Sequence, residues 1–153
     1  MDLILWRHAE AEENAELGGD LARRLTAKGE KQAARMGAWL DRQLPDGARV
    51  YASPAVRTEQ TVVALGRKYR LRDELAPDAL PEQLLQLAQW PGAKGAVLVV
   101  GHQPTLGRVI AQLLGMGEAE CAVRKGALWW LRRREREGVS QTVVLTVQTP
   151  DFH

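Results

Sequence analysis

Leu3-Ile4-Leu5-Trp6 runs directly into Arg7-His8 near the start of the chain, and this stretch decides the fold. Four consecutive apolar residues predict a strand that is covered on both faces, as in a parallel sheet between two helix layers. In open α/β sheets, ligands bind just beyond the carboxyl ends of such strands. The guanidinium of Arg7 and the imidazole of His8 are therefore expected at the ligand-binding edge of a sheet.

Two later strands are predicted to end at the same edge. The short segment Arg49–Ala52 is followed by Ser53-Pro54, which we interpret as the N-cap and first residue of a helix that carries Arg57. The apolar run Ala96–Val100 predicts a buried strand that ends in Gly101-His102. Two histidines and two arginines should thus meet where three strands end.

Amphipathic segments between the strands predict helices. Residues Ala33, Met36, Leu40 and Leu44 fall at helical spacing after Thr26. Three further helical segments are expected, one after Pro54, one over 81–90 and one after Pro104. Strands that alternate with helices predict a largely parallel sheet with right-handed crossovers.

The last part of the chain predicts a hairpin, with strands over 127–131 and 139–148 joined by a polar turn over 132–138. The expected fold class is therefore α/β, a three-layer sandwich with a mostly parallel central sheet, helices on both faces and a C-terminal antiparallel hairpin. A length of 153 residues fits one domain over 1–153.

The expected site favours an anion. Two of the three strand ends lead into helix N-termini, whose free backbone N–H groups and dipole attract negative charge. Guanidiniums such as those of Arg7 and Arg57 offer paired donors that match phosphate oxygens and can neutralise a phosphoryl group as it transfers. Arg24 is a further candidate for the rim of this pocket.

These motifs resemble those of the histidine phosphatase superfamily, and within it the small SixA-type phosphohistidine phosphatases. The resemblance rests on Arg7-His8-Ala9, on Leu25–Gly29, on Ser53–Thr61 and on Gly101-His102, in that order. It implies that His8 is the nucleophile and forms a phosphohistidine intermediate. It also implies a phosphate-binding set, which we take as Arg7, Arg57, His102, Gln103 and Arg24.

The implied substrate is phosphohistidine on a protein, such as a histidine phosphotransfer-type domain. The alternative is a small phosphomonoester. The chain departs from the family pattern at Ala9, where glycine is most common, and in the short span 73–82, where many larger members carry an acidic proton donor. Glu10 and Glu82 are the remaining candidates for a general acid.

A second hypothesis starts from Trp129-Trp130 and the basic run Arg132–Arg136. Aromatic residues among basic ones are typical of nucleic-acid-binding surfaces, so the chain could be a non-catalytic binding module. Glu135 and Glu137 interrupt the run, however, and the net charge is only +2. We favour a solvated hairpin with one tryptophan on each face, and expect no nucleic-acid partner.

The composition bears on the compartment of the protein, on membrane attachment and on metal binding. The single cysteine, Cys121, cannot form an internal disulfide, which fits a reducing cytoplasm. We expect neither signal peptide nor membrane anchor, because the start lacks a basic segment before an apolar one and no apolar run approaches ~18 residues. No cofactor or metal is expected, since carboxylate clusters and zinc-type Cys/His spacing are lacking. The oligomeric state is not encoded in any visible pattern.

Overall fold

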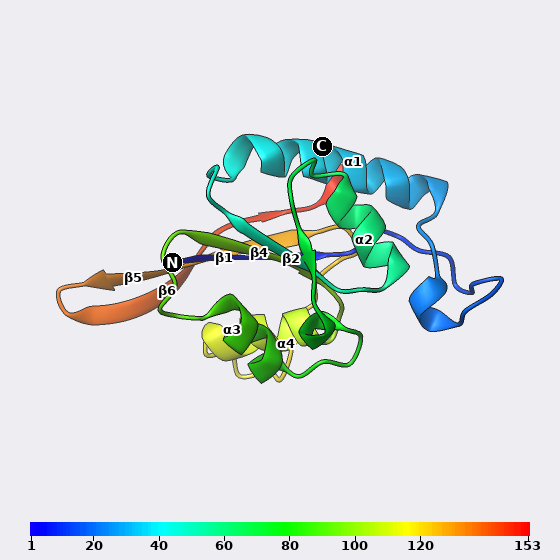
Figure 1. The fold of residues 1–153 in the computed structure, drawn as a ribbon. Coiled ribbons are helices and arrows are strands. Elements are labelled where there is room, and N and C mark those ends of the chain that lie inside the picture. The colour runs from blue at the N-terminus through cyan, green and yellow to red at the C-terminus, as the bar shows by residue number, and fades with distance from the viewer.

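A six-stranded sheet lies between two layers of helices in the computed structural model, which describes residues Met1–His153 (Figure 1). The strand order is β3-β2-β4-β1-β5-β6. β1 to β4 pair in parallel, whereas β5 is antiparallel to β1 and β6 is antiparallel to β5. The strands are β1 (Asp2–Arg7), β2 (Arg49–Ala52), β3 (Arg70–Leu71), β4 (Ala96–Gly101), β5 (Leu128–Arg136) and β6 (Val139–Gln148). This arrangement confirms the predicted mostly parallel sheet with a C-terminal antiparallel hairpin.

Helices cover both faces of the sheet, as predicted (Figure 1). α1 and α2 lie on one face, and α3 and α4 on the other. The helices are α1 (Ala27–Gln43), α2 (Val56–Val63), α3 (Pro81–Ala88) and α4 (Thr105–Leu113), with 3-10 turns η1 (Asp20–Ala22), η2 (Asp73–Leu75) and η3 (Pro150–Phe152). None of the helices combines the length and apolar character that crossing a membrane requires.

The apolar runs of β1 and β4 are buried because both faces of these strands pack against helices. Leu3 and Leu5 belong to the core beneath α3 and α4, whereas Ile4 and Trp6 belong to the core beneath α1 and α2. Every residue of β4 is buried. Two central strands packed on both faces place their carboxyl ends, and the polar residues directly after them, at a fixed edge of the sheet.

Helix α1 agrees closely with the predicted pattern. Thr26 caps it, since the Thr26 side chain accepts a hydrogen bond from the backbone N–H of Gly29 at 2.9 Å. Met36 and Leu40 are fully buried against the sheet. Gly29 lies against the backbone of Glu10, where a Cβ atom would collide with the Glu10 carbonyl. This glycine lets the first turn of α1 approach the loop after His8.

The prediction for the start of the second helix was wrong. α2 begins at Val56 with Ala55 as N-cap, two residues later than Ser53-Pro54 predicted. The Ser53 hydroxyl is instead hydrogen-bonded to His102 Nε2 at 2.8 Å, and it accepts the backbone N–H of Ala55 at 3.2 Å. Ser53 thus lies before the helix, and its hydroxyl is part of the site through His102.

The predicted turn over 132–138 was also too long. β5 continues through Arg136 and stays paired with β6 as far as Val139, which leaves Glu137-Gly138 as a two-residue turn. Both turn residues have positive φ angles, of 54° and 77°, as tight hairpins with a right-handed twist require. The basic run therefore lies along a strand that projects beyond the helices at the amino end of β1 (Figure 1).

The two tryptophans of β5 are core residues on opposite faces, in agreement with the favoured interpretation. Trp130 is buried, donates its indole N–H to Asp2 Oδ2 at 3.0 Å and contacts Trp39 edge-on. Trp129 packs against the opposite core. Trp130 is thus used inside the protein, and Trp129 is partly buried.

Candidate active site

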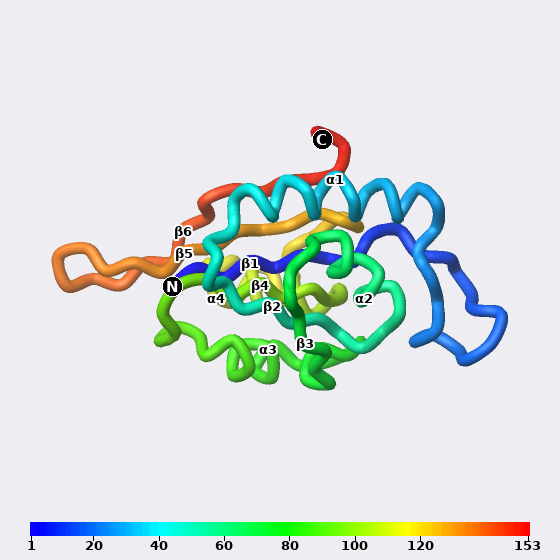
Figure 2. The backbone as a smooth tube through the Cα atoms, turned by 45° about the horizontal axis from the view of Figure 1, so that its top comes forward, coloured from blue at the N-terminus to red at the C-terminus, as the bar shows by residue number.

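The carboxyl ends of β1, β4 and β2 meet at one edge of the sheet. His8 donates its backbone N–H to the carbonyl of Gly101 at 3.1 Å, and Ser53 donates its own to the carbonyl of Val100 at 3.1 Å. The loop that leads from β1 to α1 extends from this end of the molecule (Figure 2). The structure thus brings together Arg7, His8, Arg57 and His102, the four residues on which the prediction depended.

The imidazole of His8 is buried, and one of its nitrogens is held by the backbone. Nδ1 lies 2.7 Å from the carbonyl oxygen of Ala9. A carbonyl can only accept, so Nδ1 carries the proton and Nε2 keeps its lone pair. Burial, with a smaller contribution from the Arg57 and Arg7 cations, lowers the pKa of His8 to about 4. At neutral pH this ring is uncharged and Nε2 is available as a nucleophile.

His102 faces His8, with their ring centroids 5.2 Å apart. Its Nδ1 lies 3.4 Å from Arg57 Nη2, and since a guanidinium only donates, Nδ1 is the acceptor. Nε2 therefore carries the proton and donates it to Ser53 Oγ. Burial, His8 and the Arg57 cation lower the pKa of His102 to about 3. This ring is also neutral, and its Nδ1 points at the arginine.

The guanidiniums of Arg57, which is buried, and of Arg7, which is half-buried, supply the positive charge of the site. Arg7 donates from Nη1 to the carbonyl of Val123 at 2.9 Å and has no carboxylate partner. Arg57 is only 3% exposed. The Nε atoms of both arginines are buried without a hydrogen-bond partner. Burial and repulsion by Arg57 lower the pKa of Arg7, as expected where two cations lie close together.

A carboxylate that the sequence analysis did not select lies at the edge of this site. Asp20, in η1, accepts from Arg57 Nη2 at 3.1 Å through Oδ2 and from Arg23 Nε at 3.0 Å through Oδ1. Partial burial opposes its ionisation, but the cations of Arg57 and Arg23 hold the pKa of Asp20 below its usual value. The signal available in the sequence was a pair of opposite charges three residues apart, just before the Leu25-Thr26 motif.

Arg23, rather than Arg24, contributes to the charge of the site. The Arg23 cation lowers the pKa of His8, although less than Arg57 and Arg7 do. Arg24 is exposed and lines a hollow on the loop with Glu12 and Asn14. Arg23 shares the Asp20 carboxylate with Arg57, and this contact holds its guanidinium near the site.

Gln103 is committed to the fold. Its Nε2 donates to the carbonyl of Cys121 at 2.9 Å, and its Oε1 accepts the backbone N–H of Gly107 at 2.6 Å. Both ends of the amide thus tie the first turn of α4 to the loop at Cys121. These two bonds hold the amide against the backbone, and the phosphate-binding role of Gln103 stays a prediction.

The two candidate acids are placed elsewhere. Glu10 Oε2 accepts from the hydroxyl of Thr26 at 2.8 Å, so this carboxylate anchors the start of α1. Glu82 is exposed in the first turn of α3. Asp20 is the carboxylate that contacts the site. No group of three or more His, Cys, Asp or Glu side chains is arranged to hold a metal ion.

Thr61 and Ala9 fix the end of β1 against α2. The Thr61 hydroxyl donates to the carbonyl of Arg57 at 2.8 Å and accepts the backbone N–H of Ala9 at 3.1 Å. Ala9 is fully buried and does not adopt a positive φ angle. The turn after His8 therefore accommodates alanine in place of the glycine that is common in the family.

Comparisons with known proteins agree with this geometry. The model of the histidine phosphatase superfamily (branch 1) matches residues 3–80. The phosphohistidine phosphatase SixA homolog of Haemophilus influenzae is 31% identical over 131 residues, which cover 75% of this chain and 78% of that protein. Phosphohistidine phosphatase SixA of Escherichia coli is 31% identical over 122 residues, covering 74% of each chain.

A solved structure of the protein histidine phosphatase SixA, complexed with tungstate, superposes with a TM-score of 0.78. It is 26% identical in sequence, and the match covers 99% of both chains. The chain belongs to the histidine phosphatase superfamily and is of the SixA type within it. It is thus a phosphatase, an enzyme of the hydrolase class.

Proposed function

We propose that this enzyme removes the phosphoryl group from phosphohistidine on a protein, and that His8 carries the group as a covalent intermediate. One observation supports this most directly. The neutral His8 has its proton fixed on Nδ1 by the Ala9 carbonyl, so the Nε2 lone pair is left free beside the guanidiniums of Arg7 and Arg57. A neutral nucleophile beside two guanidiniums suits phosphoryl transfer.

In the first step, His8 Nε2 attacks phosphorus and the P–N bond to the substrate imidazole breaks. The bonding electrons leave with that imidazole, whose other ring nitrogen carries a proton near neutral pH, so it departs uncharged. Arg7 and Arg57 neutralise the charge on the transferring oxygens. His102 Nδ1 reaches the same oxygens once it is protonated, which a phosphate dianion favours by raising the pKa of a neighbouring imidazole.

In the second step, water attacks the phosphorus of phospho-His8. The P–N bond breaks, inorganic phosphate forms and the proton lost by the water passes to solvent or to the phosphate. His8 returns to its neutral form with the proton on Nδ1. Neither step requires a proton from an enzymic carboxylate, which is consistent with Glu10 and Glu82 lying outside the site.

The relatives support the same substrate class. Two of them are named phosphohistidine phosphatase SixA or its homolog, and the superposed SixA structure holds tungstate, a tetrahedral oxyanion like phosphate. We further propose a histidine phosphotransfer-type domain as the natural substrate and the cytoplasm as the compartment. The buried, unpaired Cys121 suits a reducing environment.

The test is a phosphate-release screen that offers a histidine-phosphorylated protein, phosphoramidate, an aryl phosphate and sugar phosphates side by side. We expect the two P–N substrates to be hydrolysed fastest. A sugar phosphate hydrolysed with the highest kcat/KM would instead indicate a small-molecule phosphomonoesterase. His8→Ala serves as the control for contaminating activity.

A further inference from the structure

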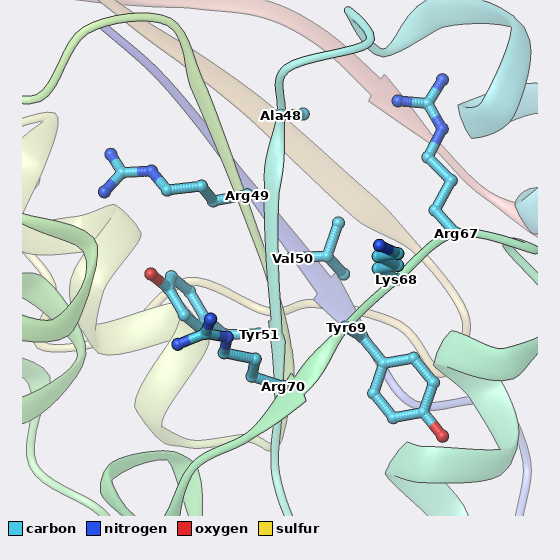
Figure 3. A pocket seen from close by; sticks show the side chains of 8 residues that line it. All are labelled: Ala48, Arg49, Val50, Tyr51, Arg67, Lys68, Tyr69 and Arg70. Atoms are coloured by element: carbon cyan, nitrogen blue, oxygen red, sulfur yellow. The ribbon is translucent and has the colours of Figure 1, made fainter.

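A hollow lies along the edge of the sheet formed by β2 and β3 (Figure 3). Its volume is about 670 Å³. The basic and aromatic residues that line it are Arg49, Tyr51, Arg67, Lys68, Tyr69 and Arg70. We call this hollow the basic groove.

Three cations of the basic groove have no acidic partner. Arg67 is used internally, because it binds Asp41 Oδ1 at 2.8 Å and the carbonyls at the end of α1. Arg49 donates only to the neutral amide of Gln89, at 3.1 Å. Lys68 and Arg70 are exposed and form no ion pair. Unpaired like charges on one edge of a fold attract an anionic partner.

The tyrosines of the groove favour a protein partner over a nucleic acid. The Tyr69 hydroxyl donates to Glu59 Oε2 at 2.6 Å, and both tyrosine rings are partly buried against the two cores. In Figure 3, Arg49, Tyr51 and Arg70 extend to one side of the β2–β3 pair, while Arg67 and Tyr69 extend to the other. Packing against the cores reduces the ring surface that could stack on bases, which is how single-stranded nucleic acid is usually held.

The basic groove and the catalytic pocket share one strand. Tyr51 lines the groove, and Ser53, two residues along the chain, is hydrogen-bonded to His102. Two residues of extended chain span about 7 Å. A phosphorylated protein bound at these strand ends is large enough to reach the groove, whereas phosphoramidate is too small to do so.

From this placement we infer that the basic groove binds an acidic segment of the phosphoprotein substrate while its phosphohistidine occupies the catalytic pocket. The inference rests on the proposed function. In this inference, Lys68 and Arg70 attract the acidic segment of the phosphoprotein and bind it. This role in substrate selection is separate from the chemistry at His8. It also predicts that salt weakens turnover of an acidic phosphoprotein more than turnover of phosphoramidate.

The experiment uses two synthetic peptides with one phosphohistidine each, flanked by glutamates in one and by glutamines in the other. The variant is Lys68→Glu/Arg70→Glu. The matched control is Arg134→Glu/Arg136→Glu, which makes the same charge change on the projecting hairpin. At low salt we expect wild type to prefer the glutamate peptide by about tenfold in kcat/KM. The groove variant should lose this preference, and the hairpin variant should keep it.

Phosphoramidate turnover should stay within about twofold in all three proteins, because the altered side chains are exposed. A groove variant that retains the preference, or a hairpin variant that loses it equally, would overturn the inference.

Fluorescence anisotropy with the unphosphorylated glutamate peptide gives a readout that is independent of turnover, and wild type should bind it more tightly than the groove variant. If neither phosphoramidate nor a phosphopeptide is hydrolysed, the proposed function fails while the binding comparison still decides on the groove. An oligonucleotide that binds the groove more tightly than the peptide would contradict the assignment to a protein partner.

Discussion

Asp20 occupies the donor fork of Arg57, since its Oδ2 lies 3.1 Å from Nη2 and its backbone carbonyl accepts from Nη1 at 2.8 Å. A phosphate held by Arg57 would need the same two donors. The loop between β1 and α1 thus supplies a carboxylate to the donors that a phosphate would use. Binding of a phosphoryl group and the contact between Arg57 and Asp20 are therefore in competition.

The Asp20→Asn variant tests this competition. Removal of the negative charge should tighten inhibition by tungstate about two- to fivefold, a modest effect because the Asp20 side chain is 57% exposed. The inhibition constant with phosphoramidate as substrate is the measurement. Glu74→Gln, which removes a comparable ion pair with Arg72, is the matched control and should leave inhibition unchanged. Weaker inhibition of Asp20→Asn would mean that Asp20 positions Arg57 for the anion.

Arg57→Lys keeps the charge but loses the planar fork. Lysine presents a single ammonium group and cannot meet two phosphate oxygens as a guanidinium does. We expect kcat/KM with phosphoramidate to fall. The fall should correspond to a loss of about 2 to 4 kcal/mol in transition-state stabilisation, the range for removal of one preorganised group. A value within about twofold of wild type would place Arg57 outside the reaction.

The histidines predict how stability depends on pH. The pKa is lowered to about 4 in His8 and to about 3 in His102, below an unfolded value of 6.5. Above pH 6.5 the two histidines are neutral in both the folded and the unfolded chain, and their contribution to the free energy of unfolding is fully present. As the pH falls below 6.5, the unfolded chain binds protons that the folded chain does not, so stability is lost until the folded pKa values are reached.

Denaturant unfolding between pH 5 and 6.5 measures this loss. Each buried histidine should contribute a slope of up to about 1.4 kcal/mol per pH unit in the free energy of unfolding. His8→Asn should remove the contribution of one histidine to the slope of the unfolding free energy against pH. His153→Asn, at an exposed position, serves as the control. An unchanged slope in His8→Asn would show that the His8 ring is not held neutral by the fold.

Much of the fold and of the site was predictable because both depend on apolar runs and on the polar residues at the ends of those runs. The runs before Arg7 and before Gly101 specified buried parallel strands, and parallel strands must end at one edge. The start of α2 was not predictable, because Ser53 is a good N-cap in isolation and only its contact with His102, a residue far along the chain, redirects it.

Side-chain direction in irregular segments also lay beyond sequence reasoning. Arg23 and Arg24 are adjacent, and only the contact with Asp20, which Arg23 shares with Arg57, shows which of them lies near the site. The place of Gln103 next to His102 gave no sign of the two hydrogen bonds that hold its amide against the backbone. The hairpin was predicted too short because charged residues resemble a turn, whereas strand pairing with β6 keeps them extended.

The absence of a carboxylic acid suited to protonating a leaving group predicts a graded substrate preference. A positioned general acid contributes about 10²- to 10⁴-fold when an alkoxide must leave, so alkyl phosphates should be poor substrates. The expected order is phosphohistidine or phosphoramidate first, activated aryl phosphates next, and sugar or serine phosphates last. A plot of log kcat/KM against leaving-group pKa should fall steeply. A flat plot with efficient turnover of sugar phosphates would mean that a donor, with Asp20 the nearest carboxylate, takes part.

The central claim is that His8 Nε2 becomes covalently phosphorylated. Brief exposure to a substrate labelled in its phosphoryl group, with a rapid quench in alkali, should trap the label on a peptide that contains His8. The label should be stable to alkali and labile to acid, as expected of a phosphorus–nitrogen bond. His8→Ala should trap no label and hydrolyse no phosphoramidate, whereas His153→Asn should behave as wild type. Label on any other residue, or full turnover by His8→Ala, would contradict the account.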